Sequence, residues 1–452
     1  MTTKLLRGRT LSSLRMPHDV EDHGSYQFET DGALLIKDGV ITAVGPYVQV
    51  RAAVSEAVEE IDHRPHLIMP GFVDLHVHFP QTQIIASYAP DLLGWLNAYT
   101  FPAELGFSEA AHCEHIASAF CDELVNNGTT TAAAYCSVHP GSVDALMAEA
   151  ARRNMLMIAG KVMMDRNAPD GLLDTAETSY RDTTALIHRW HGLGRGRIAI
   201  TPRFAITSTP AQLEAAGALV KEWPDLLIQT HLSENLDEIR YSCELYPDAK
   251  DYTDIYASYG LLHSKTLLGH CIHLSERERD VLSETGAVAV HCPTSNLFLG
   301  SGLFPLEELS KRSRPVRTGV ATDVGAGTSF SMLRTMDEAY KIQQLLGARL
   351  NPLKSFHDMT LGNAMCLGCN DRIGTLAVGR DADLVVLDAS ATSLMALRMA
   401  KVSSLAEELF MLQTLGDDRA VVETYIAGNA SKASRSVPES RIAQESLKAR
   451  PC

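Results

Sequence analysis

Two histidines, His76 and His78, stand two positions apart at the end of the apolar run "LIMPGFVDLHVH". In an extended strand, side chains two positions apart share a face, so both rings would project from the same side of the strand end. That arrangement suits a metal ion. The alternative is a pair of hydrogen-bonded polar residues at a strand end, and in a chain with 17 histidines the pair alone does not decide.

Other apolar runs end in polar residues of the same kind. "TPRF" carries Arg203, "HLSE" carries His231 and Glu234, "GHC" carries His270, and "TDVG" carries Asp323. Taken singly, His270 could be a core histidine and Asp323 a helix N-cap. Their common placement instead predicts a nitrogen and oxygen ligand set suited to zinc or iron(II).

The elements that must position these residues are short apolar runs separated by longer helix-like stretches, such as residues 108–128, which end at a glycine. Eight runs alternating with helices predict a (β/α)8 TIM-like barrel, whose chemistry lies at the carboxyl ends of the strands. The eight runs are "LIMPGFVDLH" and residues 129–137, 156–165, 198–206, 226–234, 266–272, 287–296 and 316–325.

The two ends of the sequence have a different pattern. Residues 33–45, 382–390 and 421–429 resemble short strands joined by Asp-Gly and Gly turns. We therefore expect a small composite β domain from residues 1–67 and 374–430, with the barrel at 68–373 inserted between the two parts. Residues 431–452 are polar and predict a disordered tail.

The composition limits the partners. With 45% hydrophobic and 21% charged residues, the chain has the composition of a soluble globular protein. A net charge of −15 disfavours a nucleic-acid polymer as partner. The sequence contains neither an apolar run long enough for a membrane span nor a secretory signal, and its nine cysteines form no disulfide framework. We expect a cytoplasmic protein that acts on a small molecule.

The order of the His-x-His, His-x-x-Glu, Gly-His and Thr-Asp motifs resembles that of the amidohydrolase superfamily. Four further motifs are similar to its guanine deaminase branch, and the resemblance covers about residues 30 to 430. These motifs are "PQT" at 80–82, "WLNAYTFPAE" at 95–104, "TPRF" at 201–204 and "HCPTSNLFLGSG" at 291–302.

The resemblance implies a zinc-dependent hydrolytic deamination of guanine to xanthine and ammonia by a homodimer. It assigns one Zn²⁺ per chain, with Fe²⁺ as the alternative metal, to His76, His78, His231 and Asp323. It assigns the proton transfers and the stabilisation of charge to Glu234, His270 and Asp323. The residues that it places against the purine are His78, Gln81, Arg203, Phe204, His231, Glu234 and Asp323.

A single metal is expected because strand four carries Arg203 where two-metal relatives carry a carboxylated lysine. Lys161, on strand three, is interpreted as a packing or salt-bridge residue. Another deaminase class binds zinc with His-x-Glu and Pro-Cys-x-x-Cys motifs. The similar spacings at His112 and at Cys366 and Cys369 are interpreted as coincidence, because no proline precedes Cys366.

Two other functions stay open at this point. A related amidohydrolase could share the metal site and act on 8-oxoguanine, a pterin or a triazine. A relative without activity could serve as a scaffold, but such a protein would be expected to lose ligands, and here the set is complete. Trp95 could stack on a substrate ring or pack within a helix face.

Overall fold

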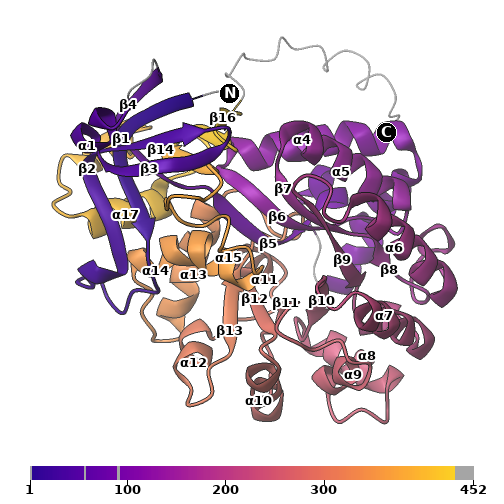
Figure 1. Cartoon of the computed structure of the whole chain (residues 1–452). Helices are drawn as coiled ribbons and strands as arrows, with labels where there is room; N and C mark the ends of the chain where they lie inside the picture. The colour runs from indigo at the N-terminus through magenta and orange to yellow at the C-terminus, as the bar shows by residue number, and fades with distance from the viewer. Residues whose placement is uncertain (1–2, 55–57, 89–91, 433–452) are drawn as a thin grey trace, which may run out of the picture.

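The computed structural model describes residues 3–54, 58–88 and 92–432. Figure 1 shows two parts, a helix-covered barrel and a smaller sheet in which the indigo N-terminal strands lie beside the yellow C-terminal segment. The fold predicted from the sequence, a (β/α)8 barrel with a small β domain built from both ends of the chain, is confirmed. The exact domain boundaries stay a prediction.

Each of the eight apolar runs contains one strand of the barrel, and all neighbouring strands of the barrel are parallel. Their order is β13-β12-β11-β10-β9-β7-β6-β5, and the two-residue β8 (Val162–Met163) pairs with β9. The strands are β5 (Phe72–His78), β6 (Thr129–Tyr135), β7 (Leu156–Gly160), β9 (Gly196–Pro202), β10 (Leu227–Leu232), β11 (Thr266–His270), β12 (Val288–His291) and β13 (Arg317–Val320).

The seam between the last strand, β13, and the first, β5, is closed by side chains as well as by backbone. Asn363 donates from Nδ2 to the carbonyls of Val73 (2.7 Å) and Val320 (2.8 Å), and its Oδ1 accepts from the Val320 N–H (3.0 Å). Beyond β13, the Asp323 N–H donates to the carbonyl of His76 (2.9 Å). The side-chain amide of Asn363 thus takes the place of strand-to-strand backbone hydrogen bonds at this seam and completes the barrel.

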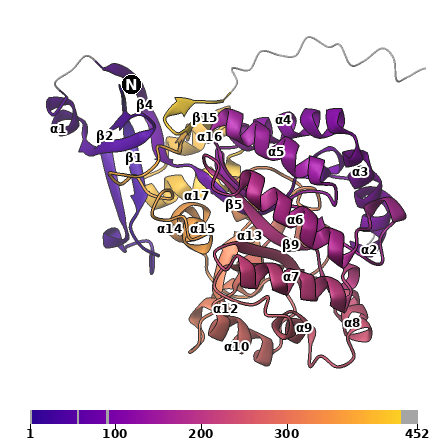
Figure 2. The ribbon, with the colours of Figure 1, turned by 45° about the vertical axis from the view of Figure 1, so that its right-hand side comes forward.

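Helices cover the outside of the barrel, as Figure 2 shows for α4 to α7. Their starts are signalled locally: α6, α8 and α10 begin with capping boxes at Thr175, Asn235 and Ser275. The helices are α4 (Ala110–Asn126), α5 (Pro140–Arg153), α6 (Ala176–Trp190), α7 (Pro210–Glu222), α8 (Leu236–Leu245), α9 (Tyr252–Ser258), α10 (Glu276–Thr285), α11 (Pro293–Phe298), α12 (Leu306–Lys311), α13 (Met332–Leu345), α14 (Pro352–His357) and α15 (Asn363–Cys366).

The smaller sheet has the order β16-β15-β14-β4-β1-β2-β3. The predicted Asp-Gly hairpin joins β2 to β3, with Asp38 at φ 50° and Gly39 at φ 85°. Its strands are β1 (Thr3–Ser13), β2 (Tyr26–Lys37), β3 (Val40–Pro46), β4 (Glu59–Pro70), β14 (Leu384–Leu387), β15 (Val421–Ile426) and β16 (Asn429–Ala430). The helices of this part are α1 (Tyr47–Ala52), α16 (Ser393–Met399) and α17 (Leu405–Leu415).

The first apolar run differs from the prediction, because it forms two strands instead of one. Leu67 to Pro70 pair with β14 in the small sheet, and the barrel strand begins only at Phe72. Gly71 lies between them, where a Cβ would come within 2.3 Å of the side chain of Thr130. A residue without a side chain is therefore needed where the chain passes from one sheet to the other.

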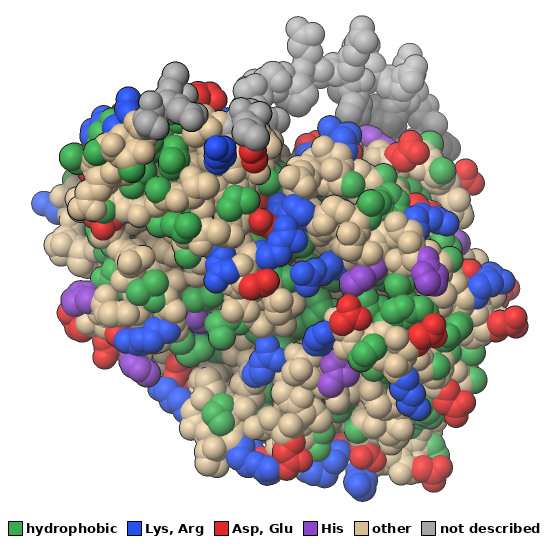
Figure 3. Space-filling model, in the orientation of Figure 1, with side chains coloured by type: hydrophobic (Ala, Val, Ile, Leu, Met, Phe, Trp, Pro, Cys, Tyr) green, Lys and Arg blue, Asp and Glu red, His purple; other side chains and the backbone are tan. Residues whose placement is uncertain are grey.

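Figure 3 shows acidic and basic side chains interspersed with apolar ones over the face seen in Figure 1. Within the described ranges, no helix is both long enough and apolar enough to cross a membrane. The predicted disordered tail falls on residues 431–452, of which 433–452 lie outside the described residues.

Candidate active site

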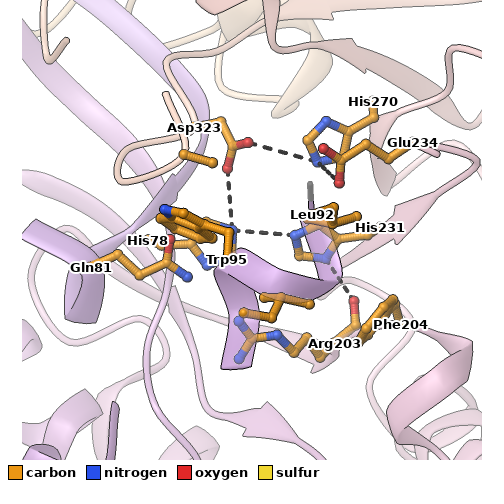
Figure 4. A pocket seen from close by; sticks show the side chains of 12 residues that line it. His78, Gln81, Leu92, Trp95, Arg203, Phe204, His231, Glu234, His270 and Asp323 are labelled. Carbon is orange, nitrogen blue, oxygen red and sulfur yellow. Dashed lines mark hydrogen bonds and ion pairs between the residues drawn. The ribbon is translucent and has the colours of Figure 1, made fainter. Parts of the chain in front are cut away.

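A cavity opens at the carboxyl ends of the barrel strands, where the sequence predicted the chemistry. Figure 4 shows the predicted residues that line it, and the ring of His76 contacts that of His78, with the ring centroids 5.0 Å apart. Trp95 and Leu92, from the short helix α2 (Leu92–Trp95), close one side. The predicted residues that line the cavity are His78, Gln81, Arg203, Phe204, His231, Glu234, His270 and Asp323.

Three imidazoles converge at the bottom of this cavity. His76 and His78 project from the same face of β5, and their Nε2 atoms are 3.1 Å apart. The Nε2 of His231, on β10, lies 3.2 Å from that of His78. The Nδ1–H of His231 donates to the Arg203 carbonyl at 2.7 Å, which leaves the Nε2 lone pair facing the other two rings.

Asp323 adds a carboxylate to the three rings. Its Oδ1 is 3.3 Å from Nε2 of both His76 and His78. Burial lowers the pKa of His78 to about 4 and that of His231 well below the ordinary value, so both rings are neutral at pH 7. Burial by itself would raise the pKa of Asp323, but the hydrogen bonds from His76 and His78 and the electrostatic interaction with His76 and His270 hold it well below its usual range. Neutral rings and an ionised carboxylate are the forms that bind a metal.

The same donor atoms satisfy the spacing of a metal site. Two groups, His76 with His78 and His231, and His76 with His270 and Asp323, each keep their ligand atoms within 4.8 Å of one another. Ring nitrogens about 2.0 to 2.1 Å from a tetrahedral zinc would lie roughly 3.3 Å apart. The observed nitrogen and oxygen separations therefore fit a metal ion held between these side chains.

The backbone turns sharply to aim these groups inward. Asp323, His270 and Ser233 have φ of 52°, 73° and 53°, in the left-handed region that costs a non-glycine residue about 1 to 2 kcal/mol. Backbone bonds hold the turns, including Cys271 N–H to the Leu232 carbonyl (2.8 Å) and Ile272 N–H to the Ser233 carbonyl (3.0 Å). Strain of this kind gathers at functional sites.

Glu234 and His270 face each other beside the ligand cluster. The Oε2 of Glu234 lies 3.4 Å from Nε2 of His270, and its Oε1 accepts from the hydroxyl of Ser301 (3.0 Å). His270 Nδ1–H donates to Oδ1 of Asn296 (2.9 Å). Burial, and then the nearby charge of Asp323, raise the pKa of Glu234 to about 8, so this carboxyl group keeps a proton at neutral pH.

Behind Glu234, a buried network fixes the turn on which it stands. Glu238 accepts from the Glu234 N–H (2.8 Å) and from the hydroxyl of Tyr252 (2.9 Å). Tyr256 donates to the His231 carbonyl at 2.8 Å. These partners were not predicted, because they lie on α8 and α9 and act through the backbone.

At the other end of the cavity, Arg203 already has a protein partner. Its Nη1 lies 2.9 and 2.7 Å from the two carboxylate oxygens of Glu104, on α3 (Phe101–Leu105). Gln81 donates to Glu104 at 3.4 Å, and its Oε1 accepts from the Gly325 N–H at 3.2 Å. Glu104 belongs to the quoted motif "WLNAYTFPAE", but no role was predicted for it from the sequence. Ser301 and Asn296 were missed in the same way within "HCPTSNLFLGSG".

The residues to which the sequence assigned no part in catalysis make structural contacts. Lys161 is buried and forms an ion pair with Asp174, as predicted. His112 packs edge-on against Phe107. Cys366 and Cys369 lie in an apolar cluster with Leu75 and Val288, and the described residues include no cysteine in a group with metal-ligand spacing.

Comparison with known proteins agrees with this site. The model of the amidohydrolase family matches residues 67–430. The guanine deaminase of Escherichia coli strain K12 is 46% identical over 428 residues, which cover 94% of this chain and 97% of that protein. The solved structure of E. coli guanine deaminase has a TM-score of 0.91 at 45% identity, covering 95% of this chain and 99% of that one.

A second solved structure, a guanine deaminase from C. acetobutylicum with guanine bound in the active site, has a TM-score of 0.85 at 28% identity. It is matched over 95% of this chain and all of that chain. The chain belongs to the amidohydrolase family. The family and the cluster of histidines and aspartate together indicate a metal site that serves hydrolysis of a small molecule.

Proposed function

We propose that this protein catalyses the hydrolytic deamination of guanine to xanthine and ammonia. The observation that carries the proposal is a single cavity that joins a metal-ligand cluster and a protonated carboxyl group to a polar edge formed by Gln81 and Arg203. The high identity to guanine deaminases over nearly the whole chain supports the same substrate.

The metal is one Zn²⁺ per chain, held by His76, His78, His231 and Asp323. Three imidazoles and one carboxylate suit zinc, and Fe²⁺ is the alternative. Strand four carries Arg203 where a second metal site would need a lysine, and Lys161 on strand three is paired with Asp174. Elemental analysis of the purified protein should give one equivalent of zinc, and two equivalents would contradict this ligand set.

When bound, the metal would lower the pKa of a water from about 15.7 to about 7 and would supply a nucleophile at neutral pH. Asp323 turns Oδ1 toward the imidazoles and Oδ2 toward His270 (3.8 Å from Nε2), so Oδ2 can take the proton from the attacking water. Because its pKa is raised, Glu234 can give its proton to the ring nitrogen beside the carbon under attack.

Collapse of the tetrahedral intermediate needs a proton on the departing amine. Glu234, a carboxylate after the first transfer, takes the hydroxyl proton of the intermediate and passes it to the amine, so that ammonia leaves and the carbonyl of xanthine forms. The proton that Asp323 took from the water then returns to Glu234, which restores both groups. As an imidazolium, His270 can donate from Nε2 to the developing oxyanion, while its Nδ1–H donates to Asn296 Oδ1 and fixes the ring. One well-placed donor of this kind can contribute about 3 to 4 kcal/mol.

The purine lies with its carbonyl toward Arg203 and its ring edge toward Gln81, and Phe204 packs against it. A site built from polar partners rejects an analogue that lacks them by a factor of about 10⁴ or more. This geometry favours guanine over rings without the carbonyl.

Purified zinc-loaded protein, incubated with guanine, 8-oxoguanine and a pterin, tests the proposal through ammonia release. We expect guanine to give the highest kcat/KM and xanthine to be the product. Release of ammonia mainly from another ring would reassign the substrate, and no release from any ring would contradict the enzymatic function. The homodimer and the cytoplasmic location stay predictions, the first of which light scattering would check.

A further inference from the structure

The polar edge of the cavity contains an acidic residue that no step of the reaction uses. Glu104 and Arg203 are 1% and 2% exposed, and the Arg203 Nη1 contacts both oxygens of the carboxylate. The pair joins α3 to the end of β9 at the recognition end of the cavity, which is the end formed by Gln81 and Arg203. A buried carboxylate at this place costs desolvation, so it calls for an explanation beyond packing.

Glu104 contacts both groups that face the purine in the proposed complex. Besides Arg203, its Oε1 accepts from Nε2 of Gln81 at 3.4 Å. The other end of Gln81 is fixed by the Gly325 N–H. One carboxylate therefore orients the guanidinium and the amide together, which fixes the directions of the donors left for a ligand.

Part of the guanidinium remains available to that ligand. Arg203 lines the cavity, and neither its Nη2 nor its Nε has a hydrogen-bond partner among residues 3–54, 58–88 and 92–432 (Figure 4). Those atoms can donate to a carbonyl. The positive charge behind them, however, is already balanced by Glu104 at 2.7 Å.

We propose that Glu104 is a positioning residue that makes this edge select a neutral carbonyl and reject an anionic group. An unpaired arginine prefers carboxylates and phosphates, because its charge offsets their loss of hydration. With Glu104 beside it, Arg203 offers N–H donors without net charge, so a buried anion would stay uncompensated. The inference rests on the proposed function, since it assumes that the purine meets this edge.

The first test is the isosteric variant Glu104→Gln. We expect KM for guanine to rise about tenfold or more, because Arg203 and Gln81 lose their common anchor. The kcat should stay within about threefold of the wild-type value, and the zinc content should stay at one equivalent. Both are expected because the substitution changes none of the metal ligands at the metal end of the cavity, which is formed by His76, His78, His231 and Asp323. A merely structural role would lower the yield or the melting temperature and leave KM of the folded enzyme unchanged, which would overturn the proposal.

The second test measures charge selectivity by direct binding to the zinc enzyme. Hypoxanthine is neutral with a carbonyl at ring position 6, and purine-6-carboxylate places an anion at the same position. Wild-type protein should bind hypoxanthine at least about tenfold more tightly. Glu104→Gln should shift the ratio of the two dissociation constants at least about tenfold toward the carboxylate.

Two control variants separate charge from position. Glu104→Asp keeps the charge with a shorter reach, so it should raise KM but leave the ratio close to that of the wild type. The double variant Glu104→Gln with Arg203→Gln removes both charges and should return the ratio to within about threefold of the wild type. An unshifted ratio in Glu104→Gln would overturn the proposal.

The outcomes also distinguish this inference from the proposed function. Binding of the two ligands needs no turnover, so a wild-type protein that releases no ammonia from guanine contradicts the function alone. A wild-type protein that deaminates guanine yet binds the carboxylate as tightly as hypoxanthine contradicts the role of Glu104. That last comparison requires no variant to fold.

Discussion

At the metal end of the cavity, the predicted ligands stand on barrel strands or within three residues of one, whereas at the recognition end Gln81 and Glu104 lie on the connection between β5 and α4. The barrel strands pair in parallel with their neighbours, so the positions of His76, His78 and His231 depend on the barrel itself. The connection is made of short helices, among them α2 and α3. The barrel strands therefore carry the reaction chemistry, whereas the connection between β5 and α4 contributes to the choice of substrate.

Removal of a metal ligand should have the largest effect, and it should act on the metal end of the cavity. His76→Ala and Asp323→Ala should each lose both zinc and activity altogether, because three ligands cannot hold the ion as four do. Metal analysis and turnover are measured on the same preparation. Full zinc occupancy in either variant would mean that the ligand set is wrong.

Glu234→Gln should separate chemistry from metal binding within the metal end. The amide keeps the size and the hydrogen bond but cannot pass a proton, so kcat should fall by about 10² to 10⁴. Zinc content and the affinity for guanine should stay close to those of the wild type. Loss of zinc would make Glu234 a ligand, and near-normal turnover would place the proton relay elsewhere.

Arg203→Ala should weaken substrate binding and leave the metal ligands intact, although it also lowers stability by leaving the buried Glu104 carboxylate unpaired. Loss of a hydrogen bond from a charged group costs about 1.5 to 3 kcal/mol, which corresponds to a rise in KM for guanine of about 10- to 150-fold. The variant should keep its zinc, because Arg203 contacts His231 only through its backbone carbonyl. An unchanged KM would remove Arg203 from the substrate edge.

The smallest effect is expected from Ser301→Ala. Its hydroxyl donates to Oε1 of Glu234, and a single hydrogen bond contributes about 1 kcal/mol, so kcat should fall about fivefold. KM and zinc should not change. A change in KM larger than the change in kcat would indicate that Ser301 contacts the substrate instead of orienting the proton donor.

The sequence predicted the metal end far better than the recognition end. Strand periodicity and the ends of apolar runs locate His78, His231 and Asp323, because ligands on parallel strands must meet at one edge of the sheet. Glu104 has no such signal. It follows Pro102 in a helix of five residues and meets Arg203 from a distant part of the sequence, so only the fold reveals the pair.

The first barrel strand shows a second limit of the sequence pattern. Leu67 to Val73 form one apolar run, but a run of this kind does not show which sheet each residue joins. The steric requirement at Gly71 becomes visible only when Thr130 lies beside it. Closure of the barrel by Asn363 was likewise hidden, because an asparagine in a helix carries no signal of a partner strand.

Asn363 also sets the time at which the site can exist in a growing chain. The strand that carries His76 leaves the ribosome early, whereas the amide that joins it to β13 is made tens of seconds later at about 5 to 20 residues per second. Until then only backbone hydrogen bonds beyond β13 join the His76 and Asp323 sides of the cluster. The nascent protein therefore acquires its full metal affinity only near the end of synthesis, after all eight barrel strands have been made.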